Sequence, residues 1–150
     1  MEKKMKMKNQ LVLILLFLLI ASIHGRSIPG FAYTRHRGRC TPQYWSSRTE
    51  AWPRMVPQTS TVSRVFGSRV FERFRSDVTL LESTTRNDDE ENVYRGMLKQ
   101  AIAALLNSYA RDGFPYTAWE VKTLVIQALV SEEAAATLAK HFSTANHACN

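Results

Sequence analysis

The sequence has few of the residues that usually build catalytic and metal sites. Among its 150 residues only two are cysteine and four are histidine, and no serine lies in a Gly-x-Ser-x-Gly turn. His141, His147 and Cys149 lie near one another in the chain, but spacings of six and two residues do not place them on one face of a helix. These absences predict a protein with no metal, no cofactor and no catalytic nucleophile, and therefore a protein that is not an enzyme.

The acidic residues are not arranged for acid–base catalysis either. The run DDEE at 88–91 is consecutive and comes just before a long periodic segment. Carboxylates in that position offset the positive end of a helix dipole, whereas a general acid and a general base must face each other across a cleft. No asparagine is followed by serine or threonine two places later, so N-glycosylation is not expected.

The sequence has no hydrophobic run long enough to span a membrane. Its most apolar stretch, LVLILLFLLI at 11–20, covers ten residues, which is about half of what a spanning helix needs. Lys3, Lys4, Lys6 and Lys8 precede this stretch, and that order is typical of a secretory signal peptide. A short buried helix of the mature fold is the alternative reading, and the lysine block disfavours it.

We therefore expect residues 1–25 to be removed and the protein to be secreted. Cleavage after Gly25 is preferred, with cleavage after Ala21 as the alternative. Removal leaves 125 residues, enough for one domain, and changes the net charge from +7 to 16 − 12 = +4.

Only Cys40 and Cys149 are available for a disulfide, and both would enter an oxidising compartment. We expect them to pair with each other. The closed loop spans 149 − 40 = 109 residues, and in the chain-entropy description such a bond stabilises the fold by about 4 to 5 kcal/mol. Free thiols or an intermolecular bridge are the alternatives that the sequence leaves open.

Residues 26–58 form, in this interpretation, an irregular arm, because they hold four of the five prolines. At most one helical turn is expected there, after Ser47, where Glu50 completes a capping-box pattern. Trp45 and Trp52 are expected to pack onto the helical body, since large aromatic side chains are costly to expose.

The same arm is basic, and its arginines are the candidate polyanion contact of the molecule. If the arm binds a ligand outside the cell, long-range attraction favours an acidic polysaccharide such as pectin, and nucleic acid is not expected. A solvated, flexible arm without a ligand is the preferred interpretation, and the polyanion contact is the alternative. The arginines in question are Arg26, Arg35, Arg37 and Arg39.

Residues 59–150 carry helical periodicity and predict the folded domain. Short helices broken at Gly67 and near Asp77 are expected first, and three longer helices follow at about 90–111, 117–129 and from Ser131 onward. No alternating β pattern of useful length occurs. The fold class is therefore all-α: a small bundle of four to six helices with an irregular N-terminal arm tied down by one disulfide.

The spacing also predicts which helix is central. In the helix at 90–111, Tyr109 is placed on the inner face, whereas Lys99 and Asn107 are placed away from it. The helix at 117–129 has a wide apolar arc that includes Trp119, so it is predicted to be the central, largely buried one.

Several strings of the sequence resemble those of the plant protodermal factor family, in its C-terminal domain. Together they span Cys40 to Asn150, nearly the whole predicted domain. Typical members place a long proline-rich, extensin-like repeat region before this domain, and here only residues 26–39 occupy that place. The matching strings are CTPQYWSS (40–47), AWPRMVPQTSTV (51–62), FG (66–67), LLNSYAR (105–111), GFPY (113–116) and ACN (148–150).

This resemblance implies a secreted plant protein of the epidermal cell layer, in or near the cell wall, with no enzymatic activity and no catalytic residues. It does not imply wall cross-linking through repeats, because the repeats are missing. We expect a structural or interaction protein that is involved in epidermal cell differentiation, with acidic wall polysaccharide or other wall proteins as partners. The alternative from a different class is an apoplastic carrier that binds a small apolar ligand between its helices.

Overall fold

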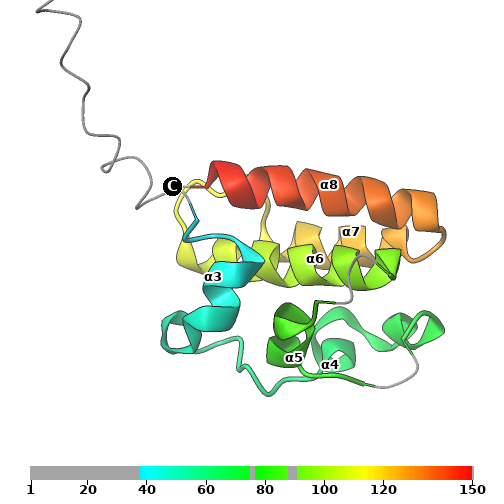
Figure 1. The fold of residues 1–150 in the computed structure, drawn as a ribbon, viewed down its shortest axis with the longest axis horizontal. Helices are drawn as coiled ribbons and strands as arrows, with labels where there is room; N and C mark the ends of the chain where they lie inside the picture. The colour runs from blue at the N-terminus through cyan, green and yellow to red at the C-terminus, as the bar shows by residue number, and fades with distance from the viewer. Residues whose placement is uncertain (1–37, 75–76, 88–90, 150) are drawn as a thin grey trace, which may run out of the picture. The chain divides into compact units, whose positions relative to one another are not determined.

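The structure is a computed structural model, and it describes residues 38–74, 77–87 and 91–149. The predicted signal peptide, residues 1–25, lies outside these residues. Within them the chain forms six α-helices and two short 3-10 helices but no strand, which confirms the predicted all-α class (Figure 1). One isolated antiparallel bridge joins Thr61 to Thr79. The elements are α3 (Pro42–Ser47), η1 (Thr49–Ala51), α4 (Val62–Phe66), η2 (Ser68–Glu72), α5 (Leu80–Thr85), α6 (Val93–Ala110), α7 (Ala118–Ala128) and α8 (Glu132–Ala148).

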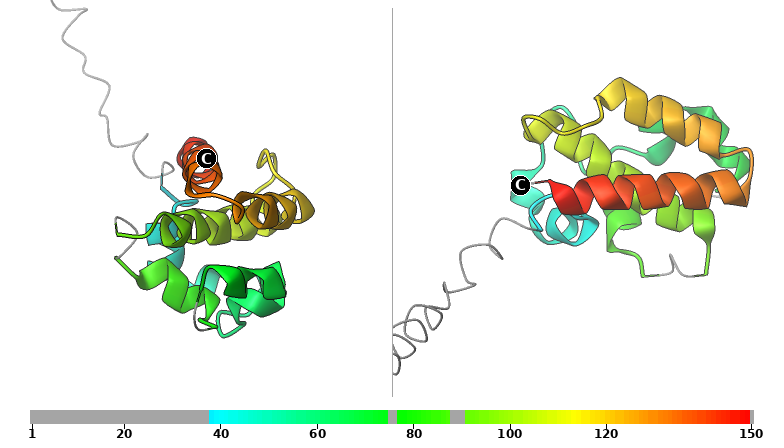
Figure 2. Two further views of the ribbon diagram at one scale, coloured as in Figure 1. Left: turned by 90° about the vertical axis from the view of Figure 1, so that its right-hand side faces the viewer. Right: turned by 90° about the horizontal axis from the view of Figure 1, so that it is seen from above.

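The helices are arranged in three levels. Helices α6 and α7 lie side by side in the middle, α8 covers them on one side, and the short elements α3 to α5 lie on the other side (Figures 1 and 2). Helix α6 packs against α8, α7, α5 and α3. None of the helices in the described part of the chain is both long and apolar enough to cross a membrane.

The central helix is α6, and the prediction that the helix at 117–129 is central was wrong. Every residue from Met97 to Leu106 except Gln100 is buried in α6. In α7 only Val121, Val125 and Ala128 are buried, and Trp119 is 74% exposed. A wide apolar arc therefore did not identify the central helix, because neighbours on both sides bury even the small and polar faces of α6.

Each described α-helix begins at a threonine, serine or asparagine whose side chain accepts a hydrogen bond from the third backbone N–H of the helix. Such caps satisfy backbone donors that have no partner inside the helix. The predicted capping box of α7 is confirmed, with Thr117 and Glu120 bonded to each other in both directions, and so is the predicted Ser131 cap of α8. The caps are Thr41, Thr61, Thr79, Asn92, Thr117 and Ser131.

The capping box changes the acidity of Glu120. A hydrogen bond from the backbone N–H of Thr117 lowers the pKa of the Glu120 carboxyl, and the Thr117 hydroxyl lowers it further. The ionised carboxylate is thus the form that fits the start of α7.

The segment 38–58 contains more helix than the sequence analysis predicted. Helix α3 was missed, although Thr41 as cap and Pro42 in the first turn are typical of a helix start. The expected capping box between Ser47 and Glu50 does not form, because the Ser47 hydroxyl donates to the Tyr44 carbonyl instead. The expected burial of the tryptophans is confirmed: Trp45 is fully buried and Trp52 is 8% exposed.

Candidate functional site

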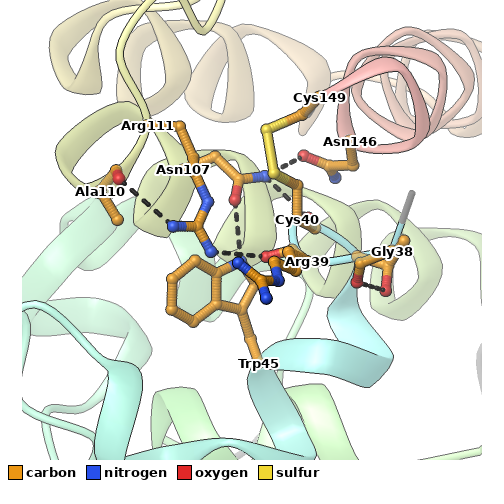
Figure 3. The surroundings of a disulfide bond; sticks show 10 residues. Gly38, Arg39, Cys40, Trp45, Asn107, Ala110, Arg111, Asn146 and Cys149 are labelled. Carbon is orange, nitrogen blue, oxygen red and sulfur yellow. Dashed lines mark hydrogen bonds between the residues drawn. A yellow bond between two sulfur atoms is a disulfide. The ribbon is translucent and has the colours of Figure 1, made fainter. Parts of the chain in front are cut away.

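The disulfide between Cys40 and Cys149 joins the start of the folded domain to its end, as predicted. The two Cα atoms are 5.9 Å apart and 109 residues apart in sequence. Cys40 comes just before the cap of α3, and Cys149 is the residue at which α8 ends. The entry to α3 and the end of α8 are therefore held together by this bond (Figure 3).

Asn107 lies at the centre of a buried polar cluster beside this disulfide. Its side-chain oxygen accepts a hydrogen bond of 2.9 Å from the indole nitrogen of Trp45. Its side-chain nitrogen donates to the Cys40 carbonyl at 2.7 Å and to the side-chain oxygen of Asn146 at 2.8 Å (Figure 3). One side chain of α6 thus binds both α8 and the entry segment, which comprises residues 38–61 and includes α3.

The cluster continues to the middle of α6 through Asn146. The side-chain nitrogen of Asn146 donates to the backbone carbonyl of Gln100 at 3.1 Å and to its side-chain oxygen at 3.0 Å. Both asparagines have no exposed surface. Buried amides are favourable only when their donors and acceptors are satisfied, so this cluster specifies how α3, α6 and α8 fit together.

Arg111, at the C-terminal end of α6, forms the outer side of the same site. Its guanidinium lies 5.4 Å from the ring of Trp45 and 5.7 Å from that of Tyr44, which are cation–π distances. It also donates to the backbone carbonyl of Arg39 at 3.0 Å and to that of Ala110 at 3.5 Å. The buried Nε atom has no hydrogen-bond partner. Arg111 therefore holds the entry segment rather than presenting a free cation.

The sequence analysis missed this cluster. It placed Asn107 away from the inner face of its helix, because helical periodicity treats a polar residue as solvent-facing. Two signals pointed the other way: Asn107 directly follows the apolar run Ala101–Leu106, and it lies in the string 105–111 that carried the family resemblance. Lys99 was misplaced in the same manner, since it is buried and donates to the Arg86 carbonyl at 2.7 Å.

The predicted polyanion contact falls mostly outside the described residues. Arg26, Arg35 and Arg37 lie there, whereas Arg39 is described and its side chain is exposed. The structure therefore does not test whether these arginines gather at one place.

Two further exposed arginines lie in the same level of the fold as α3. Arg54 follows Pro53, and Arg64 is in α4. Within the described ranges no carboxylate forms an ion pair with either of them, in contrast to Arg48 and Arg69, which pair with glutamates at 3.5 and 3.3 Å. Arg54 and Arg64 are thus two additional positive charges open to an external anion.

Two of the grooves on the surface of the described residues bear on ligand binding. One, of about 470 Å³, opens between α7 and α8 and includes Leu124, Leu138 and His141. The other, of about 310 Å³, lies over the segment Thr49–Thr59 and includes Arg54.

No group of three or more metal-ligating side chains comes together in the part of the chain that the structure describes. His147 is engaged with α8 itself, with its Nδ1 atom 2.7 Å from the Ser143 carbonyl. The Ser143 hydroxyl lies 3.4 Å from the same Nδ1 atom, but this exposed pair is one turn apart on α8 and lines neither groove. The polar residues that the fold does assemble, around Asn107, are used to hold segments of the chain together.

Comparison with known families gives one match. The sequence model of the family described as the Protodermal factor 1 C-terminal domain matches residues 40–149, from the first cysteine to the second. No curated protein and no solved structure matches the chain. The matched range is bounded by the same disulfide that closes the fold.

Proposed function

We propose, because the chain belongs to the family of the Protodermal factor 1 C-terminal domain, that it is a secreted, non-enzymatic protein of the plant epidermal cell layer. It acts in the cell wall as a structural or interaction protein. In this role it takes part in epidermal cell differentiation. The observation that carries the proposal is the disulfide between the two ends of the matched domain. Such bonds persist in oxidising compartments, and removal of a native disulfide from a small secreted domain typically costs 2 to 5 kcal/mol.

The buried polar groups support a binding role over a catalytic one. A hydrolase needs polar side chains that converge on a substrate, with a nucleophile or acid within reach of a base. Here Asn107, Asn146 and Arg111 converge on protein groups and complete the packing of the entry segment. The two asparagine amides bond within the domain, and Arg111 donates to the backbone carbonyls of Arg39 and Ala110.

The charge distribution supports attachment to an acidic polymer. Residues 26–75 hold ten arginines and two glutamates, a net charge of 10 − 2 = +8, whereas residues 76–150 hold six basic and ten acidic residues, a net charge of 6 − 10 = −4. Arg26, Arg35, Arg37 and Arg39 belong to the basic part. Long-range attraction of this kind brings a basic segment to a polyanion and weakens as salt rises.

The groove between α7 and α8 favours a second candidate, a carrier of a small apolar ligand. Leu124, Ala128 and Leu138 supply apolar walls, and a volume of about 470 Å³ is within the usual range for ligand pockets. Mass analysis of gently purified protein distinguishes the two functions. Stoichiometric lipid that co-purifies with the protein supports the carrier, and its absence supports the wall protein.

A tagged protein followed in plant tissue tests the main proposal. We expect epidermal signal in the wall fraction and release from that fraction at moderate salt, because the retention is electrostatic. A matched chain with Arg26, Arg35, Arg37 and Arg39 changed to glutamine should be released at lower salt. Recovery of the intact protein from the cytosol, with residues 1–25 attached, would overturn the proposal.

A further inference from the structure

The groove over residues 49–59 is built on contacts with the core. The indole nitrogen of Trp52 donates to the Trp45 carbonyl at 2.8 Å, so the groove is tied to α3. The side-chain nitrogen of Gln58 donates to the Thr49 carbonyl and closes the two ends of the segment onto each other. Val56, which also lines the groove, is 5% exposed and belongs to the hydrophobic core. The groove is therefore a formed feature of the fold.

The lining of this groove combines three kinds of groups. Trp52, Pro53 and Val56 supply apolar surface, and the hydroxyls of Thr49 and Thr59 form no hydrogen bond within the described part of the chain. The one charged lining residue is Arg54, which is exposed and forms no ion pair with the carboxylates that the structure describes. A planar guanidinium of this kind recognises a carboxylate through two parallel hydrogen bonds.

We propose that this groove binds a carboxylated sugar unit of an acidic polysaccharide, with Arg54 as the residue that recognises the carboxylate. The inference rests on the proposed function, and it adds a defined site to the long-range attraction of the basic arm. The sugar ring lies against the apolar surface near Trp52 and Pro53. Its hydroxyls form hydrogen bonds with the hydroxyls of Thr49 and Thr59 and with the side-chain amide of Gln58.

Charge and size favour this occupant. A volume of about 310 Å³ is at the lower limit of ligand pockets and suits one or two sugar units rather than a folded partner. A single cation matches the single negative charge of a uronic acid, and the groove lies in the basic part of the chain. The groove between α7 and α8 differs in this respect, because its charged lining residue is Glu133.

Two charge-matched variants test the site. Arg54→Gln and Arg64→Gln each remove one exposed arginine from the same level of the fold, but only Arg54 lines the groove. Binding of the oxidised mature chain to an oligogalacturonate is measured at about 0.15 M salt, with the fully methyl-esterified oligomer as the uncharged control. Circular dichroism confirms that both variants remain folded.

We expect Arg54→Gln to weaken binding about tenfold or more, because it removes a hydrogen bond to a charged group. Arg64→Gln should weaken binding by less than about threefold. Chemical shifts of residues 49–59 should move on titration. Equal losses in the two variants would overturn the groove site and leave the electrostatic attraction of the proposed function in place. The site would also be overturned if the esterified oligomer bound as tightly as the unesterified one, or if the unmodified chain bound neither. The release of the protein from the wall fraction by salt tests the proposed function separately.

Discussion

The entry segment, defined as residues 38–61, and the helices α6 to α8 are stabilised in different ways. The three long helices bury apolar stripes against one another, and their caps and periodicity specify them locally. The entry segment contains one six-residue helix and a three-residue 3-10 helix, which are too short to be stable alone. It is held by the disulfide, by Trp45 and by polar contacts with Asn107 and Arg111.

This difference shows where the stability of the domain is vulnerable. A local change in α7 removes one small contribution among many. A change at Asn107 or Cys40 acts on a segment that has few other means of staying in place. The predictions below compare these two regions, from the largest expected effect to the smallest.

Removal of the disulfide should have the largest effect. We expect Cys40→Ala with Cys149→Ala to lower the free energy of unfolding by about 4 to 5 kcal/mol, because the unfolded chain regains the freedom of a 109-residue loop. Urea denaturation of the variant and of the chemically reduced natural chain should agree. A loss below about 1 kcal/mol would show that the polar contacts alone fix the entry segment.

The variant Asn107→Ala should be next. It leaves the Trp45 indole, the Cys40 carbonyl and the Asn146 amide without their partner, and it creates a small cavity. We expect a loss of about 3 to 4 kcal/mol in the free energy of unfolding, since each buried orphan costs about 1 to 3 kcal/mol and the sites partly relax. The exposed Asn87→Ala is the matched control and should change stability by less than about 0.5 kcal/mol.

A pair of tryptophan variants sharpens the comparison between the regions. Trp45→Phe keeps an aromatic ring but removes the donor to Asn107, so we expect a loss of about 1 to 3 kcal/mol. Trp119→Phe on α7 replaces a side chain that is 74% exposed and should change stability by less than about 0.5 kcal/mol. Thermal unfolding measures both, and equal effects would contradict the assignment of Trp45 to the site.

The smallest predicted effect depends on pH and involves Asp77. Its carboxylate accepts from the Ser63 hydroxyl at 2.6 Å and from the Ser63 backbone N–H at 3.0 Å. Burial raises the pKa of Asp77, but the hydrogen bonds from Ser63 and from the Thr61 hydroxyl outweigh it, so the pKa is lowered from its ordinary value of 3.8.

The pKa of Asp77 is lower in the folded than in the unfolded chain. The ionised carboxylate therefore stabilises the fold, and this contribution is complete once the pH is about one unit above the unfolded pKa of 3.8. This contribution is lost as the pH falls through the lowered pKa. We expect it to be below about 1 kcal/mol, because the carboxylate is exposed. Asp77→Asn should therefore be less stable than the natural chain at pH 7 and should approach it at low pH. An unchanged difference at all pH values would contradict the assignment.

The sequence predicted the long helices well because their start signals are local. The threonine cap with Glu120 and the serine cap with two glutamates at α8 act within one helical turn, and Gly67, with φ of 96°, ends α4 where predicted. The single pairing of Cys40 with Cys149 followed from the count of two cysteines.

The candidate site could not be predicted, because its contacts join distant parts of the chain. Asn107 meets Cys40 across 67 residues and Asn146 across 39 residues. Periodicity cannot show that a polar side chain faces inward to satisfy a carbonyl of another segment. Trp119 was likewise expected in the interior, but it is 74% exposed, and none of the described segments buries that face of α7.

Intact mass and thiol alkylation of the protein purified from plant epidermis test the central claim most directly. The account predicts a chain that begins at Arg26 or Ser22, with no alkylated cysteine before reduction and two after it. A chain that retains residues 1–25 and has both Cys40 and Cys149 alkylated without reduction would contradict it.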